Sequence, residues 1–273
     1  MIEAVFIDLD GTLLNKNHEI SQANKKALKA LEKHNVLYFI ATGRPEQLVK
    51  KIVDDLEYDK PCIMYNGGVI GHPFKTKRKL SLALKKDVTE IIVNYCQKHN
   101  HMVMLYTQNA IFSDKNERVD FFENKNRNYE GKHHAIFKPL NQYQDEEVNK
   151  ILIVERDQSR YKTVKTFIKK LDVNSVQSQQ GFLDINPLNA SKGNAAKEIM
   201  KLYDINPTNT LALGDQENDL SMLDAVHCFV AMGNATESVK SKAHDVTFTN
   251  NNNGVAYCLD KYIIKDEQTF NKS

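Results

Sequence analysis

The sequence has little excess charge and no long apolar stretch. Its 37 basic and 35 acidic side chains leave a formal net charge of +2. A dedicated nucleic-acid-binding protein usually carries a clear basic excess, so we expect no nucleic-acid partner. No apolar run approaches the roughly 18 residues that a membrane helix needs, and the first residues lack the basic start and cleavage site of a signal peptide. We therefore expect no membrane association and a cytoplasmic location.

Cysteine is scarce, and several common nucleotide and hydrolase motifs are missing. The four cysteines lie far apart and never form a C-x-x-C pair, so we expect reduced, mostly buried thiols rather than disulfides or a zinc site. There is no G-x-x-x-x-G-K-[ST] loop, no G-x-G-x-x-G fingerprint and no G-x-S-x-G elbow. The corresponding nucleoside-triphosphate, dinucleotide and serine-hydrolase functions therefore have no support.

The first 65 residues alternate between strand-like and helix-like segments. Short apolar runs over residues 2–7, 36–41 and 62–65 predict strands that are buried on both faces. Ser21 suits the N-cap of a helix after the first run, and Pro45 suits the first turn of a helix after the second. One face of that second helix is expected to carry Leu48, Ile52 and Leu56. The order of these segments predicts a parallel sheet with right-handed crossovers.

The middle of the chain follows a different pattern. Residues 84–187 combine an amphipathic helix and a second helix with irregularly spaced strands, which is typical of an α+β domain. The α/β alternation then returns, with a strand expected over 210–213 and a helix over 219–225. The sequence thus predicts an α/β fold, with a Rossmann-like parallel-sheet core domain formed by residues 1–83 and 188–273 and an α+β domain inserted between them.

Polar residues form four clusters at predicted strand ends and helix starts. The clusters are Asp8-Leu9-Asp10-Gly11-Thr12, Ala41-Thr42-Gly43-Arg44, Ser191-Lys192-Gly193 and Gly214-Asp215-Gln216-Glu217-Asn218-Asp219. In an open parallel sheet, ligands bind beyond the carboxyl ends of the strands. Asp8 and Asp10 can divide the work between nucleophilic attack or metal binding and proton transfer. An ordinary turn after a strand is the alternative, and the match of four specified residues disfavours it.

The last cluster holds three carboxylates within five residues, and such crowding is costly unless a positive group lies among them. Mg²⁺ is the natural candidate because it prefers oxygen ligands. Helix capping alone would explain Glu217 and Asp219. The Thr42-Gly43 turn and Lys192, each before a predicted helix, suit an anion, although an ordinary turn and a solvated lysine are alternatives. Together the four clusters predict a phosphate site with a magnesium ion.

In their order along the chain, these clusters resemble the four motifs of the haloacid dehalogenase (HAD) superfamily of phosphatases. Tyr65-Asn66-Gly67-Gly68, Ala231-Met232-Gly233-Asn234-Ala235 and the insertion at residues 84–187 are similar to the Cof-like branch, which has a large α+β cap domain. The resemblance implies a phosphoric monoester hydrolase that uses Mg²⁺. It also implies that the cap contributes substrate specificity and moves about joins near Leu84 and Pro187.

The resemblance further implies a role for individual residues. Asp8 would be the nucleophile that forms an aspartyl-phosphate, and Asp10 would protonate the leaving group and then activate water. The implied metal ligands are Asp8, Asp10 through its backbone carbonyl, and Asp215, with Asp219 in support. The implied phosphate-binding residues are Leu9, Thr42, Gly43, Lys192 and Asn218.

The expected function is therefore Mg²⁺-dependent hydrolysis of small phosphorylated metabolites, with sugar phosphates as the leading class. A phosphomutase or phosphotransferase would use the same aspartyl-phosphate, and a signalling receiver would preserve it. Asp10 and the large insertion favour turnover over a receiver. We expect a monomer or a weak homodimer. Candidate contacts for substrate specificity are Arg44, Asn66, Asp184 and Asn186.

Overall fold

The computed structural model describes residues 1–75, 77–114, 136–144 and 146–264. It divides into two compact units. Unit 1 comprises Met1–Thr42, Lys60–Ile63 and Ser191–Ser273, and unit 2 comprises Gly43–Asp59 and Met64–Ala190. Within the described ranges, no helix is both long enough and apolar enough to cross a membrane.

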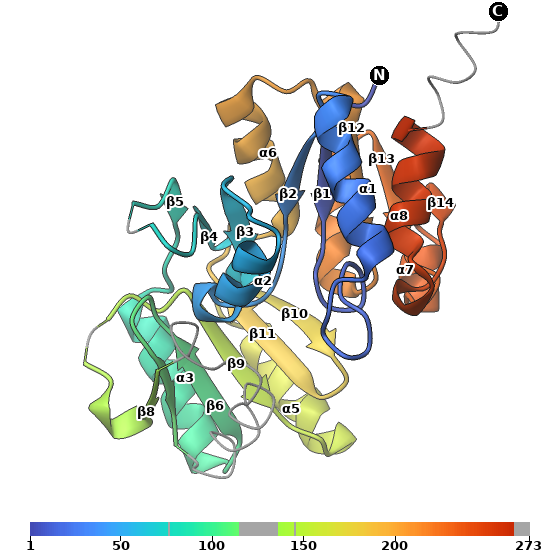
Figure 1. Cartoon of the computed structure of the whole chain (residues 1–273). Helices are drawn as coiled ribbons and strands as arrows, with labels where there is room; N and C mark the ends of the chain where they lie inside the picture. The colour runs from blue at the N-terminus through green and yellow to red at the C-terminus, as the bar shows by residue number, and fades with distance from the viewer. Residues whose placement is uncertain (76, 115–135, 145, 265–273) are drawn as a thin grey trace, which may run out of the picture. The chain divides into compact units, whose positions relative to one another are not determined.

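Unit 1 is built on a five-stranded parallel sheet (Figure 1). In spatial order its strands are β14 (Asp245–Val246), β13 (Cys228–Ala231), β12 (Thr210–Gly214), β1 (Ala4–Ile7) and β2 (Leu37–Ile40). All residues of β1 and β12 are buried, as continuous apolar runs predict for central parallel strands. The register pairs Ile7 with both Leu213 and Ile40, so the chain leaves these three neighbouring strands at the same edge.

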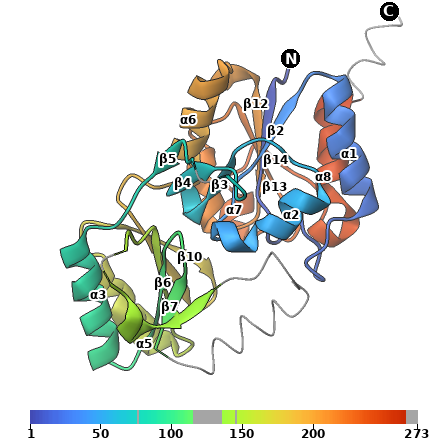
Figure 2. The same cartoon turned by 60° about the vertical axis from the view of Figure 1, so that its left-hand side comes forward.

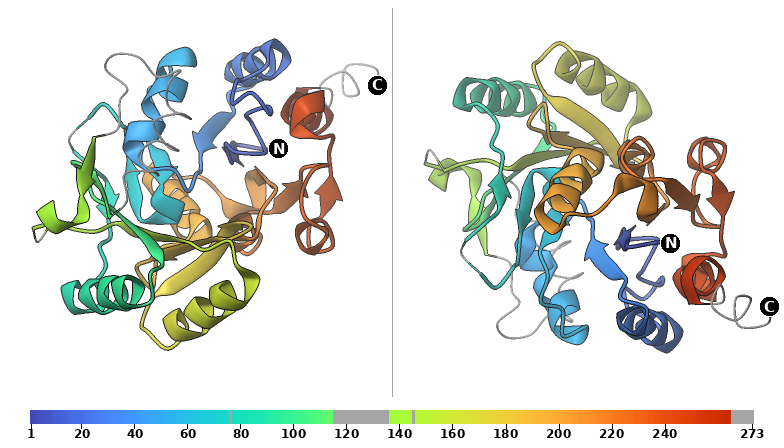
Figure 3. Two further views of the ribbon diagram at one scale, coloured as in Figure 1. Left: turned by 90° about the horizontal axis from the view of Figure 1, so that it is seen from below. Right: turned by 90° about the horizontal axis from the view of Figure 1, so that it is seen from above.

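Helices cover both faces of this sheet (Figures 2 and 3). The helical segments are α1 (Gln22–Lys33), α6 (Lys192–Tyr203), η4 (Pro207–Asn209), η5 (Glu217–Met222), α7 (Glu237–Lys240), η6 (Asn250–Asn252), α8 (Gly254–Leu259) and η7 (Asp260–Ile264). On one face α1 packs against α8, and on the other α6 packs against the 3₁₀ segment η5. Ser21 caps α1 as predicted, because its hydroxyl accepts a hydrogen bond from Asn24 N at 3.2 Å.

Unit 2 contains a six-stranded, mainly antiparallel sheet. In spatial order its strands are β10 (Asn174–Gln179), β11 (Phe182–Asn186), β9 (Lys150–Val154), β6 (Met102–Tyr106), β7 (Ile111–Ser113) and β8 (Phe137–Pro139). Helices α3 (Lys86–Lys98) and α5 (Gln158–Ile168) lie side by side on one face, where they bury an apolar core with alternate strand residues (Figure 3). Because side chains alternate along a strand, Asp184 and Asn186 point to the face opposite that of Ile185, which belongs to the core.

The remaining segments are short. They are η1 (Glu46–Leu48), α2 (Lys50–Asp55), β3 (Cys62–Met64), η2 (Tyr65–Gly67), β4 (Val69–Gly71), β5 (Leu80–Ser81) and η3 (Leu140–Gln142). All four cysteines are free thiols, and Cys228 alone among them is not fully buried.

The predicted α/β class with a parallel sheet is confirmed, but two predicted helices are wrong in detail. After Pro45 the chain forms a 3₁₀ turn before the short α2, and this change of pitch buries Val49 and Val53 rather than Leu48 and Leu56. The helix expected over 219–225 is the 3₁₀ segment η5, whose tight turns are closed by bonds such as Leu223 N to Leu220 O at 3.1 Å.

The predicted strand over 62–65 is also shorter than expected. Beside β2 it forms a single bridge, between Ala41 and Ile63, because the chain turns at Tyr65 and Asn66, which both have positive φ angles. The division into a core of residues 1–83 and 188–273 and a cap of residues 84–187 stays a prediction. Part of that cap, residues 115–135, lies outside the described residues.

Candidate active site

Two of the predicted aspartates follow adjacent strands of unit 1. Asp8 follows β1 directly, and Asp215 follows β12. Asp8 N donates to Leu213 O at 3.1 Å, which extends the pairing of the two strands by one residue. Asp8 and Asp215 are 5% and 4% exposed. Two acidic clusters separated by about 200 residues therefore meet at the carboxyl edge of one sheet.

Lys192 joins this edge from α6. Ser191 caps the helix through its hydroxyl, and Lys192 is the first helical residue and is fully buried. Its ammonium donates to Asp8 Oδ1 and to Asp219 Oδ1, both at 2.6 Å. A lysine is unfavourable at a helix N-terminus, so the two carboxylates provide the electrostatic compensation for its position.

Asp219 is held firmly by its own turn. Its Oδ2 accepts hydrogen bonds from Asp215 N at 2.9 Å and Gln216 N at 3.0 Å. Gln216 Nε2 in turn donates to Asp215 Oδ2 at 3.1 Å, and Thr12 Oγ1 donates to Asp215 Oδ1 at 3.4 Å. The contribution of Gln216 was not predicted, although the three-residue spacing of Gln216 and Asp219 is that of a capping box.

Oxygen atoms of Asp8, Asp215 and Asp219 lie within 4.8 Å of one another. Among the described residues one ammonium, that of Lys192, pairs with Asp8 and Asp219, so the three buried carboxylates leave an excess of negative charge in a place with little water. An all-oxygen donor set of this kind fits a hard divalent cation. Gly11 supports the arrangement, because its φ is 81° and a side chain at this position would collide with the Asp215 carboxylate.

Burial and mutual repulsion shift the pKa values of these groups. Burial raises the pKa of Asp8 well above its usual range, Lys192 opposes the shift, and Asp219 and Asp215 increase it. Burial, followed by the charge of Asp219, raises the pKa of Asp215 to about 7. Burial alone would lower the pKa of Lys192, but Asp219 and Asp8 raise it above its ordinary value. A cation bound among the carboxylates would favour their ionised forms.

Asp10 is more accessible than the other aspartates. Its side chain is 36% exposed, and its Oδ1 lies 3.6 Å from His18 Nδ1. The turn that carries Asp10 is also fixed by a residue that follows β13, because Asn234 Nδ2 donates to Gly11 O at 2.8 Å. The position of His18 was not predicted. A single histidine in a loop carries no sequence signal that would place it beside Asp10.

The predicted phosphate-binding residues fall in both units. Thr42 is buried in unit 1, where its N donates to Ile63 O at 2.8 Å. Leu9, Lys192 and Asn218 also belong to unit 1, whereas Gly43 belongs to unit 2 together with the specificity candidates. The candidate specificity residues are Arg44, Asn66, Asp184 and Asn186.

A parallel-sheet unit with buried aspartates and a lysine at its carboxyl edge has the groups that phosphoryl transfer requires, a carboxylate acceptor and positive charge beside it. The model of the haloacid dehalogenase-like hydrolase family matches residues 5–259. The chain belongs to this family, and the resemblance inferred from the four clusters is confirmed.

Curated relatives and solved structures agree with this family assignment. The chain is 30% identical to 5-amino-6-(5-phospho-D-ribitylamino)uracil phosphatase YwtE of Bacillus subtilis (strain 168) over 285 residues, which cover 96% of this chain and 98% of the relative. It is also 30% identical to Phosphatase YwpJ of the same organism, with 94% and 99% covered. A haloacid dehalogenase-like hydrolase from B. subtilis has a similar structure, with a TM-score of 0.85, 28% identity and coverage of 96% and 100%.

Family membership and these relatives make the chain an enzyme of the phosphoric monoester hydrolase class. YwtE is named for a small phosphorylated substrate, 5-amino-6-(5-phospho-D-ribitylamino)uracil, and phosphatases of this superfamily generally use a divalent metal. The buried carboxylates Asp8, Asp215 and Asp219 could hold one.

Proposed function

We propose that the chain is a Mg²⁺-dependent phosphatase of small phosphorylated metabolites, with Asp8 as nucleophile and Asp10 as general acid and base. The observation that carries the proposal is the bond from Lys192 to Asp8 within a buried group of three carboxylates. This bond fixes the orientation of the Asp8 carboxylate before a substrate arrives. A fixed, ionised carboxylate beside a cation-binding site is what attack on a phosphate ester needs.

In the first step, an oxygen of Asp8 attacks phosphorus and the bond from phosphorus to the ester oxygen breaks. Asp10, in its protonated form, gives its proton to the departing oxygen. In the second step, Asp10 takes a proton from water, and the resulting hydroxide attacks the phosphorus of the aspartyl-phosphate. Inorganic phosphate leaves, and the Asp8 carboxylate is regenerated. The greater exposure of Asp10 supports its role, because it has to exchange protons with the leaving group and with water.

The carboxylates of Asp8 and Asp215 and the backbone carbonyl of Asp10 are the proposed ligands of Mg²⁺, with Asp219 in support. When bound, the ion would neutralise charge on the phosphoryl group. Asp219 suits a supporting role because both of its oxygens already accept hydrogen bonds, from Lys192 and from two backbone amides. The backbone amides of Leu9 and Gly43 and the side chains of Thr42, Lys192 and Asn218 are the proposed phosphate donors.

Sugar phosphates are the leading substrate class from the sequence. The name of one relative, YwtE, specifies a phosphate carried on a ribityl group, which is a polyol chain. The class expected from the sequence and the name of this relative both point to a phosphate ester of a polyhydroxylated carbon chain. We propose that residues 84–187 form a cap that contributes the specificity. A cytoplasmic location and a monomer or weak homodimer stay predictions.

The test is a panel of sugar phosphates, polyol phosphates and 5-amino-6-(5-phospho-D-ribitylamino)uracil, assayed for phosphate release with and without MgCl₂. We expect Asp8→Asn to abolish release and Asp10→Asn to lose turnover, while the exposed Asp224→Asn serves as the control. Phosphate release by purified Asp8→Asn would refute the nucleophile assignment. Formation of an isomeric sugar phosphate without free phosphate would identify a phosphomutase instead.

A further inference from the structure

A second set of buried polar side chains lies within unit 2. Lys150, on β9, is 5% exposed, and its ammonium donates to Gly43 O at 2.8 Å. The same ammonium lies 3.3 Å from Asp184 Oδ1. Asp184 Oδ2 accepts a hydrogen bond from Asn66 Nδ2 at 2.9 Å. We call Asn66, Lys150 and Asp184 the Lys150 triad.

Two members of the triad contact Gly43: Lys150 at its carbonyl oxygen and Asn66 beside its α-carbon. A Cβ atom on Gly43 would lie 2.7 Å from Asn66 Oδ1, so the Asn66 amide packs directly against the glycine. Asn66 reaches this position with a φ of 54°, in the left-handed region that asparagine tolerates better than most residues. Lys150 and Asn66 thus restrict the position of this glycine, and Asp184 contacts both of them.

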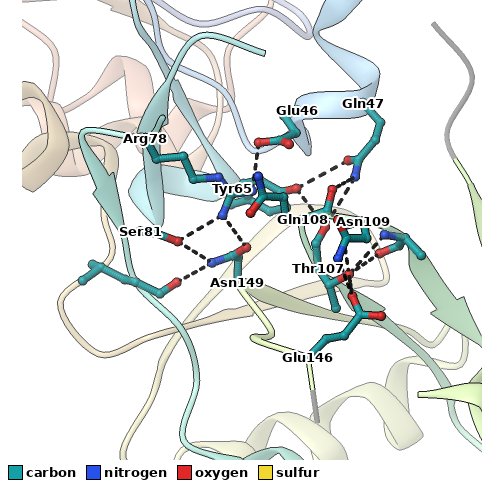
Figure 4. Close-up of polar contacts among 12 residues, drawn as sticks. Glu46, Gln47, Tyr65, Arg78, Ser81, Thr107, Gln108, Asn109, Glu146 and Asn149 are labelled. Atoms are coloured by element: carbon teal, nitrogen blue, oxygen red, sulfur yellow. Dashed lines mark hydrogen bonds and ion pairs between the residues drawn. The ribbon is translucent and has the colours of Figure 1, made fainter. Parts of the chain in front are cut away.

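The residues after Gly43 are fixed to the same unit (Figure 4). Glu46 forms an ion pair with Arg78 at 2.9 Å, and Gln47 Nε2 donates to Gln108 O at 2.9 Å. Arg78 also donates to Asn149 Oδ1 at 3.2 Å, and Asn149 precedes Lys150 in the chain. Gly43 is therefore the start of a segment held at several points, and Lys150 holds the end nearest the proposed phosphate-binding amide.

A contribution to stability does not by itself explain why Lys150 and Asp184 are buried together. Burying an ammonium and a carboxylate costs several kcal/mol of desolvation per ion, and an apolar pair of similar volume is often as stable. Lys150 uses part of its hydrogen-bonding capacity on a backbone carbonyl rather than on Asp184. A charged group that binds the peptide of a ligand-binding loop restricts its orientation, and orientation is what binding a phosphoryl group requires.

We propose that Lys150 is a positioning residue of the phosphatase reaction, which holds the Gly43 peptide so that its N–H is oriented for a phosphoryl oxygen. Asp184 balances the charge of Lys150, and Asn66 fixes Asp184. The inference rests on the proposed role of the Gly43 amide. Because the phosphoryl group is common to all substrates, loss of Lys150 weakens the binding of every substrate by the same factor. Binding lost equally from the ground state and the transition state raises KM and leaves kcat nearly unchanged.

The experiment uses the full chain with Lys150→Met and the double variant Lys150→Met/Asp184→Asn, which avoids leaving a buried carboxylate without its partner. Lys165→Met is the matched control, because Lys165 lies 5.8 Å from the ring of Tyr161 much as Lys150 lies 4.8 Å from the ring of Tyr106. Steady-state kinetics on two unrelated substrates give kcat and KM. Calorimetry with orthophosphate in the presence of Mg²⁺ gives a dissociation constant for the phosphate group alone.

We expect KM for both substrates and the dissociation constant of orthophosphate to rise together by about tenfold, the size expected for a weakened hydrogen bond to a charged group. The control variant is expected to match the wild type. A rise in KM for only one substrate, with orthophosphate binding unchanged, would show that Lys150 contacts the leaving group. That result would overturn the proposal. An unchanged KM in the folded double variant would overturn it as well.

A third variant keeps the test decisive if both Lys150 variants fail to fold. Asn66→Gly retains access to positive φ and removes the amide that packs against Gly43. We expect a smaller rise in the same two constants, and no rise would contradict the proposal. A wild-type protein that releases phosphate from no substrate would refute the proposed function, whereas active wild type with unaffected variants would refute only the role of Lys150.

Discussion

Lys192 donates to Asp8 at 2.6 Å although 184 positions separate the two residues in the chain. The bond joins the first turn of α6 to the end of β1, so the start of a helix and the end of a strand are fixed to each other through one ammonium. Lys192 also binds Asp219, and it is the link between the proposed nucleophile and the proposed support of the metal.

Replacing Lys192 with methionine tests this link. Lys192→Met removes the ammonium but keeps most of the side-chain volume, and it leaves Asp8 and Asp219 facing each other without a positive group. We expect kcat/KM to fall by roughly 10²–10³-fold, the loss typical of a donor that stabilises developing charge. Lys197→Met, an exposed position on the same helix, is the control in the same phosphate-release assay. A Lys192→Met enzyme with near-normal kcat/KM would remove the lysine from the mechanism.

Metal binding should be visible in thermal unfolding. Mg²⁺ at 100 times its dissociation constant stabilises the folded state by about 2.7 kcal/mol, which corresponds to a rise in Tm of roughly 5–10 °C. Asp215→Asn removes one proposed ligand and also relieves repulsion with Asp219, the charge that raises the pKa of Asp215 after burial itself. We therefore expect the metal-free variant to unfold at or above the wild-type temperature and to gain nothing from Mg²⁺. Scanning calorimetry measures both effects, with Asp224→Asn as control. An equal gain in Asp215→Asn and wild type would place the metal elsewhere.

The acidic residues of the candidate site can be predicted from the sequence because the patterns that identify them are local. Asp8 and Asp215 each end a short apolar run, and parallel strands bring such ends to one edge. Lys192 also has a local signal, because a lysine at the start of a helix indicates an anion nearby. These inferences need only the position of each residue in its own element.

The rest of the site depends on distances between elements that periodicity does not encode. Whether Lys150, within an apolar strand, reaches Gly43 depends on strand register and on the turn at Asn66. Six residues of η5 are too few to distinguish a 3₁₀ from an α-helical spacing, and β14 has only two residues. His18 lies near Asp10 through loop geometry alone.

Acid sensitivity should arise in part at Asp245. Hydrogen bonds from Lys261 and Tyr262, both 2.6 Å long, hold the pKa of this carboxyl below its usual range. A pKa lowered by folding contributes stability that is present above the unfolded value, about 3.9, and is lost as pH falls through the folded value. We expect Asp245→Asn to lower stability at neutral pH and to reduce the loss of stability between about pH 5 and pH 2. Urea unfolding across this range measures the slope, with the exposed Asp55→Asn as the control. If stability changes with pH in the same way in Asp245→Asn and wild type, Asp245 does not contribute to acid sensitivity.

Asn186 combines a cost to folding with a candidate role in specificity. It is fully buried, and neither its side-chain nitrogen nor its oxygen has a hydrogen-bond partner in the described part of the chain. A buried polar group without a partner costs about 1–3 kcal/mol, and leucine has the same branching without that cost. We expect Asn186→Leu to raise Tm and, because Asn186 is a candidate substrate contact, to raise KM for the preferred sugar phosphate more than for a phosphate ester without hydroxyl groups. Cys96→Ala, a change confined to the apolar core of the same unit, separates general packing effects from this one. A lower Tm with unchanged KM would show that the Asn186 amide is stabilised within the fold and does not serve the substrate.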